Sequence, residues 1–145
     1  MAKWAQGNFT PTNPQKYVGK HTPRYRSGWE LTFMQFCDNN PNIISWASEP
    51  VSINYTHPLT GKMSTYMPDF IVVYMDKNKK KHAELIEIKP SKQTTLEAAG
   101  RSMRDQAAAV LNAYKWQAAQ AWCSQNGLRF RVLTENDIFH QGKAR

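Results

Sequence analysis

Two β-prone runs separated by a short lysine-rich segment dominate the middle of the chain. The first is Tyr66 to Met75, YMPDFIVVYM, and the second is His82 to Lys89, HAELIEIK. Residues 77–81, KNKKK, lie between them. Runs of Ile, Val, Tyr and Phe on both sides of a polar turn are typical of an antiparallel hairpin. Pro90 ends the second strand, because proline has no amide to donate and restricts the residue before it.

The second of these strands ends in a charged pair, Glu87 and Lys89. Residues two apart on a strand leave the same face, so both side chains point one way while Ile86 and Ile88 point into a core. Asp69 lies on the preceding strand and shares the Glu87 face only for some registers of the hairpin. The numbers of two residues paired across the hairpin must add up to an even number, which requires an odd number of residues in the loop between the strands. Glu84 falls on the opposite face, where we expect it to be exposed or salt-bridged.

The remaining patterns predict the order helix, three strands, helix, strand. We expect a helix over 27–39, short strands over 43–47 and 51–55, a hairpin turn at 57–61, a helix over 103–125 and a strand over 128–133. The long helix carries one apolar stripe, formed by Met103, Ala107, Val110, Tyr114, Ala118 and Ala121. This order predicts a single-domain α/β fold with a mixed central sheet flanked by helices.

Charge and length bound the partners and the domain plan. The 145 residues fit one domain: a basic N-terminal arm over 1–26, the main domain over 27–140 and a short tail over 141–145. A net charge of +8 favours a polyanion, and nucleic acid is the commonest soluble one. No segment approaches the roughly 18 apolar residues of a membrane span, so no membrane partner is expected.

Two groups of cations are candidate contacts to a nucleic-acid backbone. Arg24 and Arg26 close the arm, and Lys79, Lys80 and Lys81 lie in the hairpin turn, which we place beside the charged pair. Charge runs are often plain solvated surface, so this alternative remains open for both groups.

Asp69, Glu87 and Lys89 together are what metal-dependent phosphodiester hydrolysis needs. Two close carboxylates can hold Mg²⁺ or Mn²⁺, and the cation polarises the phosphate and activates water. Lys89 can orient that water or offset charge in the transition state. The alternative is an ion pair on a solvated strand, since E-x-K strings are common by chance.

The string Pro68-Asp69 followed by Glu87-Ile88-Lys89 resembles the PD-(D/E)xK nuclease superfamily. The segments RYRSGWE, YKWQAAQAWCSQNG and VLTENDI are similar to the branch that holds transposon end-nicking endonucleases and the head-completion nucleases of T-even-like phages. By this resemblance Glu30 is a further acidic residue of the metal site. Residues 27–30, SGWE, also form a capping box, which gives Glu30 a purely local role.

The resemblance implies a magnesium-dependent DNA endonuclease that acts on packaged DNA ends during virion assembly, in the host cytoplasm or on the virion, and meets head or portal proteins. One alternative is a structural head-completion protein that docks at the portal and has lost its activity. Another is a non-catalytic DNA-binding protein, which would not need the intact acidic set. The oligomeric state and the form of the DNA are left open.

Overall fold

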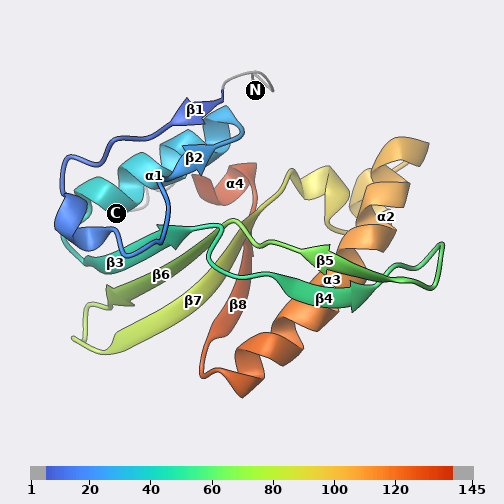
Figure 1. Ribbon diagram of the computed structural model, residues 1–145. Coiled ribbons are helices and arrows are strands. Elements are labelled where there is room, and N and C mark those ends of the chain that lie inside the picture. Colours follow the sequence, from blue (N-terminus) through green and yellow to red (C-terminus); the bar gives the residue numbers. More distant parts are fainter. Residues whose placement is uncertain (1–5, 139–145) are drawn as a thin grey trace.

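The computed structural model describes residues 6–138, and its order of elements agrees with the expected helix, strand meander, helix and strand (Figure 1). The first residues of the arm and the expected tail over 141–145 lie outside the described part. The helices are η1 (Pro14–Lys16), α1 (Gly28–Asn39), η2 (Ser91–Gln93), α2 (Leu96–Ala99), α3 (Met103–Gln125) and α4 (Glu135–Ile138). The strands are β1 (Gly7–Asn8), β2 (Arg24–Tyr25), β3 (Ile43–Ser48), β4 (Ile53–Thr56), β5 (Met63–Tyr66), β6 (Phe70–Met75), β7 (Lys81–Ile88) and β8 (Arg129–Leu133).

Four strands form the central sheet in the order β3-β6-β7-β8. The pairs β3·β6 and β6·β7 are antiparallel, and β8 joins β7 in parallel after the long crossover through α3. Short β1 and β2 pair with each other, as do β4 and β5. The expected fold class, a mixed sheet flanked by helices, is confirmed.

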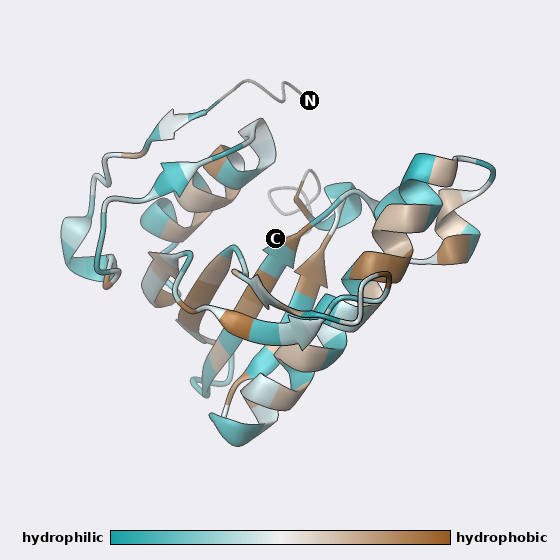
Figure 2. Ribbon diagram, turned by 45° about the vertical axis from the view of Figure 1, so that its right-hand side comes forward, coloured by the Kyte–Doolittle hydropathy of each residue, from teal (hydrophilic) through white to brown (hydrophobic). Residues whose placement is uncertain are grey.

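The two faces of the central sheet are buried by different helices. Phe33 and Met34 of α1 pack on Phe70, Val72 and other residues of one face. The opposite face is covered by α3 and the β4–β5 hairpin, whose apolar side chains form a second core. In Figure 2 the hydrophobic colour runs along the central strands, while the connecting turns are hydrophilic. This arrangement leaves the polar ends of the strands as the place for a site.

The expected strand over 66–75 is in fact two strands of different sheets. β5 ends at Tyr66 and pairs with β4, whereas β6 begins at Phe70 and pairs with β3 and β7. Pro68 lies between them and is fully buried. Proline cannot donate to a β ladder, so the chain changes sheets there. Asp69 therefore stands at the very start of β6 instead of inside a long strand.

The segment before α1 is bound to the domain over residues 6–26, contrary to the expectation of an arm without folded structure. Its anchor is Asp38, a buried residue of α1 that is 2% exposed. The Asp38 carboxylate accepts hydrogen bonds from the amides of Thr12 at 2.8 Å and Asn13 at 2.9 Å. Lys16 Nζ donates to the Asp38 carbonyl oxygen at 3.2 Å. An Asp at this position gives no sequence signal, because its partners lie about 25 residues away.

The long helix begins and ends as expected, but the apolar stripe read from its sequence is not its buried face. Met103 is 82% exposed and Tyr114 is 46% exposed. The residues that α3 buries are Asp105, Ala109, Asn112, Ala119 and Cys123. The small side chains of this face let the helix lie close to the sheet, and packing overrode the hydrophobic pattern. Within residues 6–138, no helix is both long enough and apolar enough to cross a membrane.

Candidate active site

Asp69 and Glu87 are brought together by the register of the β6–β7 hairpin. The ladder begins with Phe70 paired to Ile86, so paired numbers sum to 156, and Asp69 lies one residue before the ladder, level with Glu87. Five residues, 76–80, separate the last paired residues, and this odd number meets the condition set by the sequence. Asp69 Oδ2 accepts a hydrogen bond from the Ile88 amide at 2.7 Å, which fixes the carboxylate beside the end of β7.

Glu87 is nearly inaccessible to solvent, and one of its oxygens has no partner. The whole residue is 4% exposed. Oε2 lies 3.9 Å from Lys89 Nζ, while Oε1 is buried without a hydrogen bond. A buried carboxylate oxygen left unpaired is costly, so such an arrangement indicates that a cation or water completes it. Lys89 is itself partly accessible, with 32% of its side chain exposed.

Glu30 takes part in both of the arrangements that the sequence offered. Ser27 Oγ accepts from the Glu30 amide at 3.2 Å, as in a capping box. The Glu30 carboxylate, however, accepts from the Arg26 amide at 3.1 Å and not from the Ser27 amide. It also lies near enough to Asp69 and Glu87 to raise the pKa of both carboxyl groups. The N-terminus of α1 therefore directs a third acid toward the pair.

The pKa values of all three carboxyl groups are raised above their ordinary range. For Asp69 the cause is first burial and then the charges of Glu87 and Glu30, while the Ile88 amide and Lys89 act in the opposite direction. Burial is also the largest cause at Glu87 and at Glu30. The buried Asp69 and Glu87 carboxylates, with the charge of Glu30 acting on both, repel one another, and a bound cation would relieve this repulsion.

Glu49 is a residue of the site that the sequence patterns did not indicate. Glu49 follows β3, and its amide donates to the Asp69 carbonyl oxygen at 2.8 Å. Its carboxylate pairs with Arg26 at 2.9 Å. Its φ of 46° lies in the left-handed region, which is strained for a residue other than glycine, and it precedes Pro50. The one available signal was the Glu49-Pro50 pair, because the residue before proline is conformationally restricted.

Tyr66 is a further residue of the site that the sequence did not indicate. It is 5% exposed, and its hydroxyl is buried without a hydrogen bond of good geometry. Burial, the charge of Glu87 and hydrogen bonding with Glu87 all raise the Tyr66 pKa, so the phenol lies beside that carboxylate. Trp116 Nε1 of α3 is buried close to the same hydroxyl. These buried polar groups therefore gather behind Glu87, where the sheet meets α3.

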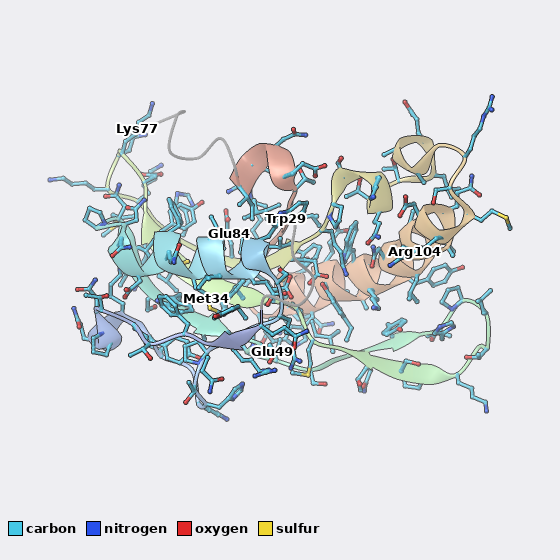
Figure 3. The ribbon with its side chains drawn as sticks, turned by 90° about the horizontal axis from the view of Figure 1, so that it is seen from above. Trp29, Met34, Glu49, Lys77, Glu84 and Arg104 are labelled. Carbon is cyan, nitrogen blue, oxygen red and sulfur yellow. The ribbon has the colours of Figure 1, made fainter. Side chains whose placement is uncertain are left out.

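The lysine-rich turn lies at the far end of the hairpin, and its expected place beside the site is wrong. Lys79 and Lys80 are in the turn and Lys81 begins β7, whereas Asp69 precedes the first residue of β6. Met75 pairs with Lys81 and lies six residues after Asp69, which at about 3.3 Å per residue puts roughly 20 Å between the turn and Asp69. Figure 3 shows Lys77 of this turn well apart from Glu49, the site residue labelled in that view.

The other two predicted contact residues and Glu84 have clear surroundings. Arg26 is held near the site by its ion pair with Glu49. Arg24 is exposed, and its guanidinium donates a hydrogen bond to Gln6 Oε1 at 3.3 Å. Glu84 is on the face opposite Glu87, as expected, but it is buried, at 2% exposed. Tyr74 Oη donates to it at 2.7 Å, and Arg131 lies 3.5 Å away. With Arg129 at 3.9 Å as well, Glu84 is salt-bridged, which confirms one of the two alternatives expected for it.

The donor set fits a hard divalent cation. Within residues 6–138, no three carboxylate, histidine or cysteine side chains are close enough to form a ready-made metal cage. Mg²⁺ does not need one, because it is usually held by one or two carboxylates together with water and substrate phosphate. Asp69 and Glu87, with the unpaired Glu87 Oε1, provide that minimal set.

This fold and site define a class of nuclease. Residues 40–135 match the family described as the TnsA-like endonuclease N-terminal domain, and the chain belongs to that family. The head completion nuclease of Enterobacteria phage T4 is 36% identical over 142 residues, covering 91% of this chain and 92% of that protein. The resemblance seen in the sequence is thereby confirmed. The family match includes Asp69, Glu87 and Lys89 but begins after Glu30.

Proposed function

We propose that this protein is a Mg²⁺- or Mn²⁺-dependent DNA endonuclease whose active site consists of Asp69, Glu87, Lys89 and Glu30. The observation that carries the proposal is the Asp69 carboxylate beside the end of β7, where it accepts from the Ile88 amide at 2.7 Å, together with Lys89 Nζ 3.9 Å from Glu87 Oε2. Membership of an endonuclease family supports the same chemistry. The metal dependence is inferred from the chemistry of the donors.

In this reaction water adds to phosphorus, one P–O ester bond breaks, and a proton passes to the leaving oxygen. Asp69 and Glu87 would hold the divalent cation, which polarises the phosphate when bound. The Lys89 ammonium lies 3.9 Å from Glu87 Oε2 and is partly exposed, so it can orient the water or offset the charge that builds on the phosphate. Glu30 would contribute as a ligand or through a bound water, held in place by the Arg26 amide.

We further propose that the enzyme acts during completion of a phage head, in the host cytoplasm or on the virion, on the ends of packaged DNA. The printed name of the T4 relative describes a nuclease of head completion. The similarity spans nearly the whole of both chains, so it is not restricted to a shared nuclease core. Contacts with head or portal proteins belong to the same proposal.

The test is cleavage of supercoiled plasmid by the full chain in Mg²⁺, Mn²⁺ or EDTA. Wild type should nick and then linearise the plasmid only with a divalent cation. Asp69→Asn should abolish cleavage, because it removes a ligand charge while keeping the size of the side chain. Glu97→Gln, an exposed acid on α2, is the matched control and should cleave as wild type does.

Two results would overturn the proposal. Cleavage that survives in the folded Asp69→Asn protein would place the active site elsewhere. A folded wild type that never cleaves, with any cation or DNA form, would favour the structural head-completion role instead.

A further inference from the structure

Lys115, in the middle of α3, reaches the site from the helix that covers this face of the sheet. Its Nζ lies 6.0 Å from the centre of the Tyr55 ring and 5.6 Å from the centre of the Tyr66 ring. Both tyrosines are buried and come from the β4–β5 hairpin. An ammonium within about 6 Å of an aromatic face is attracted to it, so the two rings hold the lysine in one place.

No carboxylate in residues 6–138 lies within ion-pair distance of Lys115, although its side chain is half-buried. Its pKa is lowered, first by burial and then by the neighbouring charge of Lys89, while Glu87 and Asp69 act in the opposite direction. Two ammonium groups therefore sit near each other at one site. Glu87 and Asp69 offset part of this repulsion, but Glu87 lies within ion-pair distance of Lys89 alone, so a further anion beside Lys115 would be favourable.

We infer that Lys115, held by Tyr55 and Tyr66, binds a backbone phosphate of the DNA. This phosphate is the neighbour of the one that is cleaved beside Lys89. This inference rests on the proposed nuclease function. Phosphate is the anion that the substrate itself brings, and a lysine binds it as a point charge. The aromatic rings reduce the freedom that the side chain would otherwise lose on binding.

The arrangement also gives the separate β4–β5 sheet a role. The hairpin packs on α3 and belongs to the same core, so Tyr55 and Tyr66 fix the Lys115 side chain relative to β7. The phosphate site is thus built by three elements: α3 provides the charge, the hairpin orients it, and the end of β7 provides the second cation. None of these contacts involves the lysine-rich turn.

The experiment measures DNA binding without cleavage. In an Asp69→Asn background without divalent cations, a labelled 20-base-pair duplex is titrated at several salt concentrations. Lys115→Met, which keeps the side-chain length over the two rings but removes the charge, should weaken binding roughly fivefold. It should also reduce the slope of log K against log salt by about 0.9, the value for one lost phosphate contact.

Two further variants test whether the effect depends on the positive charge of residue 115 and on its position at the site. Lys115→Arg should restore most of the affinity and the salt slope, because it keeps a cation on the rings. Lys77→Met removes the same charge from the distant turn and should leave the slope unchanged. If Lys115→Met does not fold by circular dichroism, Lys115→Gln takes its place with the same expected result.

The outcomes distinguish this inference from the nuclease proposal. An unchanged affinity and slope in folded Lys115→Met would overturn the phosphate contact, even if cleavage by the corresponding variant with intact Asp69 became slow. A lost contact together with a wild type that never cleaves would support the phosphate site and overturn the nuclease. Absence of any DNA binding by the parent protein would overturn the phosphate contact, while plasmid cleavage by wild type with a divalent cation would still establish the nuclease.

Discussion

The carboxylate of Asp69 is tied to the backbone of the neighbouring strand, because it accepts a hydrogen bond from the Ile88 amide at 2.7 Å. The same side chain therefore has a structural task and a proposed catalytic one. A substitution that removes the acceptor disturbs both, so the choice of variant decides what an activity assay measures.

Asp69→Ala and Asp69→Asn should both lack cleavage, but their stabilities should differ. Alanine leaves the Ile88 amide without its acceptor, whereas asparagine keeps an oxygen in reach. An unsatisfied buried donor costs about 1 to 3 kcal/mol, so Asp69→Ala should be less stable than Asp69→Asn by that amount. Urea unfolding of the two proteins measures the difference. Equal free energies of unfolding would show that the hydrogen bond contributes nothing.

Stability without divalent cations should fall with rising pH because of the site. The Asp69 pKa is raised above its ordinary 3.8 in the folded chain, so the folded state holds its proton longer than the unfolded state. The penalty is absent below about pH 4 and grows as the pH rises through the raised pKa. The difference in unfolding free energy between wild type and Asp69→Asn, measured from pH 4 to 8, should show this decline. A difference independent of pH would contradict the assigned repulsion.

A divalent cation should restore the stability that the protein loses at high pH. Mg²⁺ or Mn²⁺ binds the ionised carboxylates, so it should raise the Tm of wild type more at pH 8 than at pH 5. Glu87→Gln should lose most of the increase, because it removes the charge of the residue with the unpaired Oε1. Glu97→Gln should retain it. An equal increase in wild type and Glu87→Gln would indicate that the cation binds elsewhere.

Neutralising the lysine-rich turn should change cleavage little. Lys80 lies at the end of the hairpin remote from Glu87, so Lys80→Gln should alter the rate less than about twofold at moderate salt, where the Debye length is near 10 Å. Lys89→Met should reduce the rate by two orders of magnitude or more, on the order of the loss of one charge-stabilising group. A large effect at Lys80 would mean that the DNA extends along the whole hairpin.

The buried carboxylate of Asp38 should be essential for holding the N-terminal segment. Asp38→Ala removes the acceptor of two backbone amides, and hydrogen bonds to a charged group contribute about 1.5 to 3 kcal/mol each, so a loss of roughly 3 kcal/mol is expected. Limited proteolysis should then cut between residues 12 and 26. Asp76→Ala, in the exposed hairpin turn, is the control. Unchanged protease resistance in Asp38→Ala would show that other contacts hold the segment.

The sequence alone determined the features that depend on near neighbours. The cap at Ser27, the limits of α3 and the hairpin on either side of 77–81 follow from local propensity and turn chemistry, and all are seen in the structure, although the first strand begins only at Phe70. The sequence also set the condition for Asp69 to share the Glu87 face, an odd loop length, and the five residues 76–80 meet it. These properties are fixed within a few residues or by the alternation of a strand.

Only the tertiary structure decided the features that depend on packing between distant segments. The site combines the start of α1, the ends of β3 and β7 and the middle of α3, and it brings Lys115 and Glu49 beside Glu87 and Asp69. The same packing exposed the apolar stripe of α3 and buried Glu84. Burial and charge repulsion are sums over neighbours far apart in the sequence, so no local pattern could predict them.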